Sequence, residues 1–151
     1  MDNSKLVSLP IVAYFKLDNS LCPKTEEEKD SMLNVPYSNA VGSLMYFMVS
    51  TRPDLSFAMS VLSRFMSNLG NYHWEAMKWL LRYVKGTKNL GLIYEKKNGT
   101  KLVLEGFVDS DYAGNKNNKR STTSYSFCLN GCCISWKTQL QPIVALSTTE
   151  A

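Results

Sequence analysis

The chain has 151 residues, of which 44% are apolar and 20% are charged, and it carries a formal net charge of +4. This composition excludes a disordered chain and suffices for one domain with a hydrophobic core, or for two small units packed together. The mild positive charge is compatible with nucleic-acid binding, but it is too common among other proteins to indicate it.

The N-terminal segment indicates an intracellular protein. The first ten residues contain an early acid, Asp2, and no apolar stretch of signal-peptide length, and no segment approaches a transmembrane span. We therefore expect no membrane contact and a location in the cytoplasm or nucleus.

His73, the only histidine, is expected to pack on its helix or to cap it. The sequence has no Cys-x-x-Cys pair, so zinc is not expected, and no secretory context supports disulfides, so the thiols should fill space. The four cysteines are Cys22, Cys128, Cys132 and Cys133.

Residues 1–36 are predicted to form an extended arm. This segment shows little hydrophobic periodicity, contains Pro10, Pro23 and Pro36, and carries a charged run over residues 24–30. At most one short helix is expected in it, at about residues 25–33.

Three helices are predicted over residues 37–88. Residues 38–50 are apolar on nearly every side, which is typical of a helix buried in a small bundle. A second helix, at about residues 53–67, starts after Thr51 with Pro53 in its first turn and Asp54 near its positive end. Its apolar stripe should face the core. The stripe consists of Leu55, Ala58, Met59, Leu62, Phe65 and Met66.

The third helix is predicted to run from a cap at Asn71 to a stop at Gly86. One side of it is apolar, and Lys78, Arg82 and Lys85 recur on another side at spacings of four and three. This ridge of cations is either a track for the phosphates of a nucleic acid or an ordinary solvated face. The apolar side comprises Trp74, Met77, Leu80, Leu81 and Val84.

From residue 90 the hydrophobic period changes to two, which predicts strands at 90–95 and 102–109 around a turn at 97–100. Two further strands, at about 124–129 and 132–138, flank Asn130 and Gly131, a strong hairpin signal. After Pro142 and a short apolar run, residues 147–150 resemble the first turn of a helix. The order of these elements predicts an α+β fold, with an arm, a three-helix segment at 37–88 and an antiparallel sheet within 89–151.

Asp109 and Asp111 are the carboxylates best placed for chemistry. Asp109 follows the apolar pair Phe107 and Val108, and a carboxylate at the end of a central strand is suited to hold a divalent metal ion. The alternative is a pair of turn aspartates that bond their own backbone. The residues themselves leave both interpretations open. Neither a Walker loop nor a Tyr-x-Asp-Asp run is present, and His73 has no triad partners.

Ordered motifs along nearly the whole chain are similar to the Pol polyprotein of copia-type LTR retrotransposons. The motifs that carry this resemblance are Val41-Gly-Ser-Leu-Met-Tyr46, Thr51-Arg-Pro-Asp-Leu55, Val61-Leu-Ser-Arg-Phe-Met-Ser-Asn68, His73-Trp-Glu-Ala-Met-Lys-Trp79, Leu81-Arg-Tyr-Val-Lys-Gly-Thr87, Val108-Asp-Ser-Asp-Tyr-Ala-Gly114, Ile134-Ser-Trp-Lys137 and Gln141-Pro-Ile-Val-Ala-Leu-Ser-Thr-Thr-Glu-Ala151.

The resemblance implies a fold and a set of site residues. Residues 37–88 would correspond to the helical thumb and connection that follow the reverse transcriptase palm, and residues 89–151 to an incomplete RNase H domain. Asp109 matches the first metal-binding catalytic aspartate of that domain, which uses Mg²⁺ in the intact family. The second catalytic acid would follow Ala151, and Glu150 matches an earlier acid that is not a ligand. We therefore expect Asp109 to be a vestigial catalytic residue, with no cofactor and no catalysis in this fragment.

Three hypotheses about function follow. The favoured one is a truncated Pol fragment without catalysis that retains nucleic-acid binding, with an RNA–DNA hybrid as partner and Lys78, Arg82 and Lys85 as contacts. The alternative is an exapted, secreted RxLR-type effector of a pathogen that modulates host plant cell death or immunity, because similar sequences occur among such effectors. The absence of an Arg-x-Leu-Arg motif from the sequence argues against this alternative. The third is that a partner chain supplies the missing strands and helices, which would complete the sheet and reconstitute an active RNase H.

Overall fold

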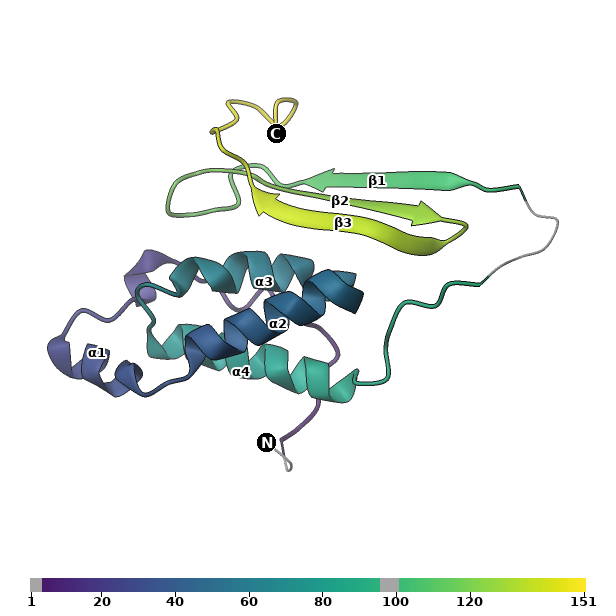
Figure 1. The fold of residues 1–151 in the computed structure, drawn as a ribbon. Coiled ribbons are helices and arrows are strands. Elements are labelled where there is room, and N and C mark those ends of the chain that lie inside the picture. Colours follow the sequence, from purple (N-terminus) through teal and green to yellow (C-terminus); the bar gives the residue numbers. More distant parts are fainter. Residues whose placement is uncertain (1–3, 96–100) are drawn as a thin grey trace.

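The computed structural model of the protein describes residues 4–95 and 101–151, and in these it has four α-helices followed by one antiparallel sheet of three strands. Figure 1 shows two layers, with the sheet over α2 and α3 and with α4 on the side of the helical layer away from the sheet. The predicted α+β class is confirmed. The elements are η1 (Asn19–Leu21), α1 (Glu26–Leu33), α2 (Tyr37–Thr51), η2 (Pro53–Leu55), α3 (Ser56–Leu62), η3 (Ser63–Phe65), α4 (Asn71–Gly86), β1 (Leu104–Ser110), β2 (Thr122–Leu129) and β3 (Cys132–Leu140), where η marks a 3₁₀ helix.

The short helix α1 is held at its N-terminus by reciprocal hydrogen bonds. The Thr25 hydroxyl accepts from the Glu28 backbone N–H at 3.2 Å, and the Glu28 carboxylate accepts from the backbone N–H groups of Thr25 and Lys24. This capping box satisfies N–H groups that have no partner inside a helix. The prediction of one short helix in the N-terminal arm is confirmed.

The helix α2 buries one face and not its whole circumference. Tyr37, Val41 and Leu44 are buried, at spacings of four and three, whereas Tyr46 is 78% exposed. The prediction of a helix buried on nearly every side is wrong, because α2 lies at the surface of the helical layer (Figure 1). The Tyr37 hydroxyl donates a hydrogen bond to the Leu62 carbonyl at 2.8 Å, which ties α2 to the end of α3.

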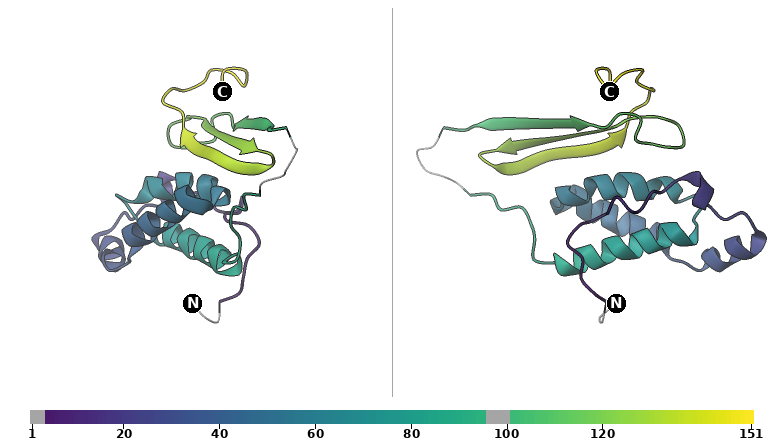
Figure 2. Two further views of the ribbon diagram at one scale, coloured as in Figure 1. Left: turned by 45° about the vertical axis from the view of Figure 1, so that its right-hand side comes forward. Right: turned by 180° about the vertical axis from the view of Figure 1, so that it is seen from behind.

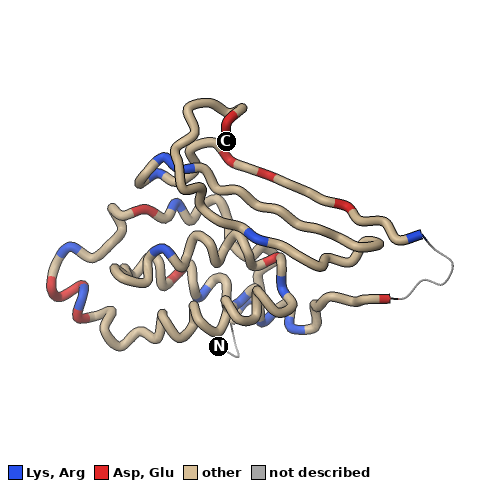
Figure 3. Tube along the Cα trace, turned by 45° about the horizontal axis from the view of Figure 1, so that its top comes forward, with Lys and Arg blue, Asp and Glu red and all other residues tan. Residues whose placement is uncertain are grey.

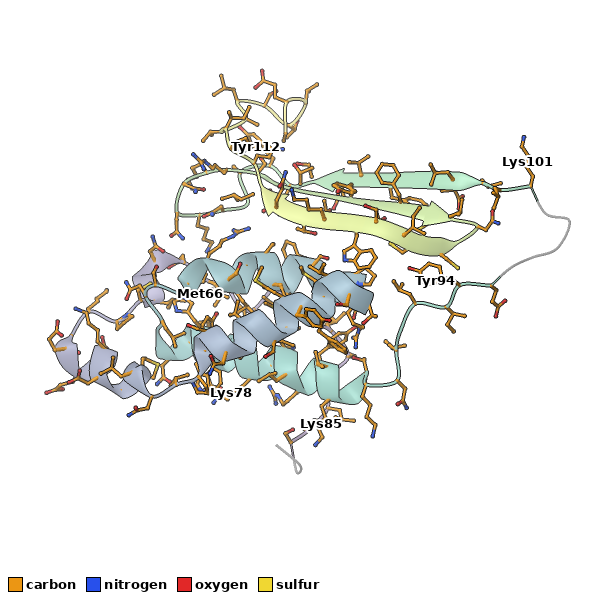
Figure 4. All side chains as sticks on the ribbon, viewed as in Figure 1. Met66, Lys78, Lys85, Tyr94, Lys101 and Tyr112 are labelled. Atoms are coloured by element: carbon orange, nitrogen blue, oxygen red, sulfur yellow. The ribbon has the colours of Figure 1, made fainter. Side chains whose placement is uncertain are left out.

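The second predicted helix is divided into η2, α3 and η3. Five of the six residues predicted to form its apolar stripe are buried, and the exception is Met66, which is 45% exposed (Figure 4). Met66 follows η3, and the tighter winding of a 3₁₀ turn rotates later side chains away from an α-helical stripe. The prediction is therefore right for the core and wrong at the end of the segment.

The helix α4 is capped differently from the prediction. Gly70 is the N-cap residue, with extended backbone, and Asn71 is the first helical residue. The Nδ1 atom of His73 accepts a hydrogen bond from the Gly70 backbone N–H at 3.0 Å, and the His73 ring stacks on Phe65 with centroids 4.0 Å apart. Burial lowers the pKa of His73, which favours the neutral ring that this acceptor role needs. The prediction that His73 packs on or caps its helix is confirmed.

A buried arginine joins the segment before η2 to the end of α4. Arg52 is 1% exposed, and its guanidinium donates hydrogen bonds to the two oxygens of the Asp54 carboxylate at 2.9 and 2.7 Å. It also donates to the Thr87 carbonyl at 3.1 Å and to the Thr87 hydroxyl at 2.7 Å. The guanidinium lies 5.7 Å from the ring centroids of both Phe47 and Tyr83. The Arg-Pro-Asp motif is therefore a structural link between helices.

The Asp54 carboxylate makes the stability of the fold sensitive to acid. Burial raises its pKa, but hydrogen bonds from Arg52 and from the Tyr83 hydroxyl outweigh burial, so the pKa of Asp54 lies below its ordinary value. A depressed carboxyl pKa contributes stability that is complete above the pKa in the unfolded chain and is lost as pH falls through the lower folded value.

We therefore expect Asp54→Asn to flatten the fall in unfolding free energy between about pH 5 and pH 2. Urea denaturation at several pH values measures this slope in the variant and in the wild type. Some slope should remain, because the pKa values of Asp18 and Glu28 are also lowered, by hydrogen bonds from neighbouring side-chain and backbone donors. An unchanged slope in Asp54→Asn would contradict the expectation.

The sheet has the order β1-β2-β3, and β2 and β3 form the predicted hairpin. Asn130 and Gly131 have φ values of 50° and 83°, the left-handed conformation that an Asn-Gly hairpin turn requires. The predicted strand at 90–95 is wrong, since these residues form no strand and run past β3 as a connection. The Tyr94 hydroxyl donates a hydrogen bond to the Cys133 carbonyl at 2.8 Å. The predicted turn at 97–100 lies outside the described residues.

The N-terminal arm lies against α4, as Figure 2 shows from behind. The Trp79 indole N–H donates a hydrogen bond to the Leu9 carbonyl at 3.0 Å, and the Phe15 ring lies 5.7 Å from the Tyr72 ring and 5.8 Å from the Trp79 ring. Val7 and other apolar residues of the arm pack against the helical core. The arm is thus part of the folded unit. The predicted domain boundaries remain a prediction.

Candidate functional site

Asp109, the predicted metal-binding residue, lies on β1 and is exposed. It is paired in register with Ser124 of β2, and it lines a cavity of about 470 Å³ between the sheet and the η2–α3 segment. Within the described residues β1 is an edge strand of the sheet, so Asp109 does not lie on the central strand that the metal-binding interpretation assumes.

Asp111 has a different role from Asp109. Its Oδ1 atom accepts hydrogen bonds from the backbone N–H of Thr122 at 2.6 Å and of Gly114 at 3.4 Å. Asp111 lines a second cavity, beside the N-terminal arm, which Asp109 does not line. For Asp111 the structure therefore supports the turn aspartate, which closes the start of the loop between β1 and β2.

The arrangement around Asp109 does not by itself fit Mg²⁺. In residues 4–95 and 101–151, no group of three or more His, Cys, Asp or Glu side chains could hold a metal ion. Asp54 lines the same cavity as Asp109, but its carboxylate is already engaged by Arg52 and Tyr83. Mg²⁺ needs an octahedral shell of oxygen ligands, and one free carboxylate binds it weakly. Asp109 offers that single carboxylate.

The two aspartates should respond differently to substitution. We expect Asp111→Ala to lower the free energy of unfolding by about 1–2 kcal/mol, because it leaves two backbone N–H groups without their acceptor. Asp109→Ala, at an exposed position, should change it by less than about 0.5 kcal/mol. Urea denaturation of the two variants measures both values. A larger loss for Asp109→Ala than for Asp111→Ala would contradict the assignment.

The cations Lys78, Arg82 and Lys85 project from α4. Lys78 forms an ion pair with Glu75, one helical turn earlier, and the Arg82 guanidinium lies 4.8 Å from the centroid of the Trp79 ring. Figure 4 shows Lys78 and Lys85 on the side of the helical layer that faces away from the sheet. The structure therefore brings these cations together on one element, far from the cavity of Asp109.

The surroundings of these cations were not predicted from the sequence. Glu75 lies three residues before Lys78 and neutralises part of its charge. The signal was available in the spacing of three residues between the two side chains. The ring of Trp79 orients Arg82, and the Nε atom of Arg82 is buried with no hydrogen-bond partner among the described residues. In Figure 3, basic and acidic residues alternate over the helical layer and no single basic face stands out.

All four cysteines are free thiols and partly buried, which agrees with their predicted use as space-filling residues. Among the helices described, none combines the length and apolar character that a membrane span requires.

The sequence is similar to segments of larger proteins. It is 51% identical over 151 residues to the retrovirus-related Pol polyprotein from transposon TNT 1-94 of Nicotiana tabacum, a match that covers 100% of the chain and 11% of that polyprotein. It is 42% identical over 115 residues to the corresponding polyprotein from transposon RE1 of Arabidopsis thaliana, of which 8% is covered. The chain thus spans about a tenth of the length of these relatives.

A third relative is much closer in length. The chain is 50% identical over 119 residues to secreted RxLR effector protein 161 of Plasmopara viticola, and this match covers 79% of the chain and 82% of the effector. No protein-family model matches the sequence, and no solved structure does.

Proposed function

Because this chain belongs to the family of retrovirus-related Pol polyproteins from transposons, we propose that it is a Pol-derived segment that binds nucleic acid and has no catalytic activity of its own. In finer terms, residues 37–88 represent the thumb and connection of a reverse transcriptase, and residues 89–151 represent part of an RNase H domain. Asp109 then stands at the position of the first metal-binding acid of that domain.

The observation that supports binding is the set of cations on α4. Lys78, Arg82 and Lys85 repeat at spacings of four and three, so they follow one side of the helix, while Glu75 offsets one of these charges. Phosphate oxygens accept hydrogen bonds from guanidinium and ammonium groups, and Arg82 is held in place by the Trp79 ring. An RNA–DNA hybrid is the partner that the Pol relationship suggests.

Fluorescence anisotropy with a labelled RNA–DNA hybrid tests this proposal. The triple variant Lys78→Gln, Arg82→Gln, Lys85→Gln should bind about tenfold more weakly at 0.1 M salt, and the slope of log K against log salt should fall by about 2–3, because up to three phosphate contacts are lost. The matched control is Lys24→Gln, Lys29→Gln, Lys101→Gln, which removes three cations elsewhere, including one, Lys29, in an i, i+3 ion pair like that of Lys78. Equal slopes for the two triple variants would reject α4 as the contact.

The absence of catalysis has a separate test. The purified protein should not cleave the RNA strand of an RNA–DNA hybrid with either Mg²⁺ or Mn²⁺, because a two-metal mechanism needs several carboxylates around the ions. Asp109→Ala is the control for a contaminating nuclease. Cleavage by the wild type that Asp109→Ala abolishes would overturn this part of the proposal.

A second candidate function rests on length. The chain and the secreted RxLR effector of Plasmopara viticola match over most of both sequences, unlike the chain and the Pol polyproteins. As an alternative, we propose a secreted effector that alters cell death or immunity in a host plant. Expression of the wild-type protein in leaf tissue should then change the extent of elicited cell death. Expression of the Arg52→Ala variant, whose fold is disturbed, should leave it unchanged. No difference between wild type and empty vector would remove this alternative.

A further inference from the structure

A cavity of about 530 Å³ lies between three parts of the chain that are distant in sequence. Its walls come from residues 9–17 of the arm, from the α3–η3 segment, and from residues of the loop between β1 and β2. This volume is within the range of small-molecule sites, which are mostly apolar and hold a few polar groups. The apolar wall includes Ile11, Phe15, Leu17, Phe57, Val61 and Phe65.

Arg64 is the arginine in this wall, and part of its guanidinium is unused. Its side chain is partly buried, its Nε donates to the Ser60 carbonyl at 2.8 Å, and its Nη2 lies 3.5 Å from the Thr122 hydroxyl. No ion pair with Arg64 and no partner for its Nη1 occur in the described chain. A cation that is partly removed from water is stabilised by a counter-charge, because its own hydration is reduced. Burial accordingly lowers the pKa of Arg64, against a smaller opposing effect from Asp111.

The charges that line the cavity are complementary to an anion. Lys16, Arg64 and Lys116 line it together with one acid, Asp111. The Oδ1 atom of Asp111 is occupied by two backbone N–H groups. A planar guanidinium with unused N–H groups matches a carboxylate, which can accept two parallel hydrogen bonds.

We propose that this cavity binds a monocarboxylate with an apolar tail, such as a medium-chain fatty acid. Its carboxylate would bind the Arg64 guanidinium, with Lys16 and Lys116 adding long-range attraction, and its tail would lie along the apolar wall formed by the arm and α3. The site is independent of the nucleic-acid contact on α4, because no cation of α4 lines it.

Isothermal titration calorimetry with decanoate, below its critical micelle concentration, tests the site. Wild type should bind decanoate, and Arg64→Met should bind it roughly tenfold to a hundredfold more weakly, because a hydrogen bond to a charged group is lost. The matched control Arg120→Met makes the same chemical change in the loop between β1 and β2, at a residue that does not line the cavity. This variant should bind decanoate as wild type does. Decanol, which lacks the charge, should bind more weakly than decanoate to wild type and equally to wild type and Arg64→Met.

Two results would overturn the proposal. One is the absence of decanoate binding to wild type, and the other is equal binding of decanoate by wild type and Arg64→Met. Because Arg64 also bonds Ser60, the variant must first show the wild-type circular dichroism spectrum. NMR titration of the wild-type protein is a second test that needs no variant. Decanoate should shift the backbone amide signals of residues that line the cavity, such as Val61, Arg64 and Asn117. Shifts confined to residues outside the cavity wall would also overturn the proposal.

Discussion

Replacing Arg52 with alanine is expected to lower the free energy of unfolding by about 3 kcal/mol, within the 3–5 kcal/mol range for breaking a buried pair. The guanidinium is almost completely buried and makes four hydrogen bonds to Asp54 and Thr87. Its removal leaves the Thr87 carbonyl, near the C-terminus of α4, without this donor, and opens a space between the Phe47 and Tyr83 rings. The Asp54 side chain is 33% exposed and regains water, which keeps the loss near the lower limit.

Urea denaturation followed by far-UV circular dichroism measures this loss. Arg120→Ala removes an arginine whose side chain has no hydrogen bond or ion pair in the described part of the chain, and it should change the unfolding free energy by less than about 0.5 kcal/mol. The double variant Arg52→Ala, Asp54→Ala should cost less than the sum of the two single changes, because the residues interact directly. A loss below about 1 kcal/mol for Arg52→Ala would show that the network does not hold the helices together.

Replacing Gly70 with alanine is expected to destabilise the fold by about 1–3 kcal/mol through overpacking. A Cβ atom at this position would lie 2.2 Å from the carbonyl oxygen of Leu21 and 3.3 Å from Nδ1 of His73. The Leu21 oxygen belongs to the backbone of η1, so it can move only if η1 separates from the start of α4. That movement would also disturb the hydrogen bond between Gly70 and His73 that caps α4.

Gly42→Ala is the matched control for Gly70→Ala. Gly42 lies inside α2, and a Cβ atom there would have no heavy atom within 4 Å. Alanine is favoured over glycine in a helix interior by about 0.5–1 kcal/mol, so Gly42→Ala should raise the unfolding free energy. Thermal melting of both variants should therefore shift in opposite directions. Equal melting temperatures for Gly70→Ala and wild type would contradict the close approach of η1 to α4.

Arg52 and His73 show how the motifs shared with Pol are used. The Arg-Pro-Asp run has the residue types of a binding site, but Arg52 and Asp54 satisfy each other and the end of α4. The single histidine has the chemistry of an acid or base, but it caps its own helix and is fully buried. Both positions therefore hold the fold together.

The sequence alone was sufficient where the pattern is local. Hydrophobic spacing identified five of the six residues in the α3 stripe, and the Asn130–Gly131 pair identified the hairpin, because only neighbours along the chain decide these features. The sequence also indicated the capping role of His73 and left a turn role open to Asp111. Each side chain accepts a hydrogen bond from a backbone N–H three residues away, that of Gly70 and that of Gly114.

Only the tertiary structure determined where Asp109, the apolar residues of α2 and Arg64 lie. The residues of β1 would suit an edge strand as well as a central strand. Only the order of the strands in the sheet makes Asp109 an exposed residue of an edge strand. The sequence of α2 is apolar on nearly every side, and only the position of α2 at the surface of the helical layer determined which of its residues are buried. The cavity around Arg64 joins the arm, the α3–η3 segment and the loop after β1, and contacts between such distant segments arise from packing, which local patterns do not encode.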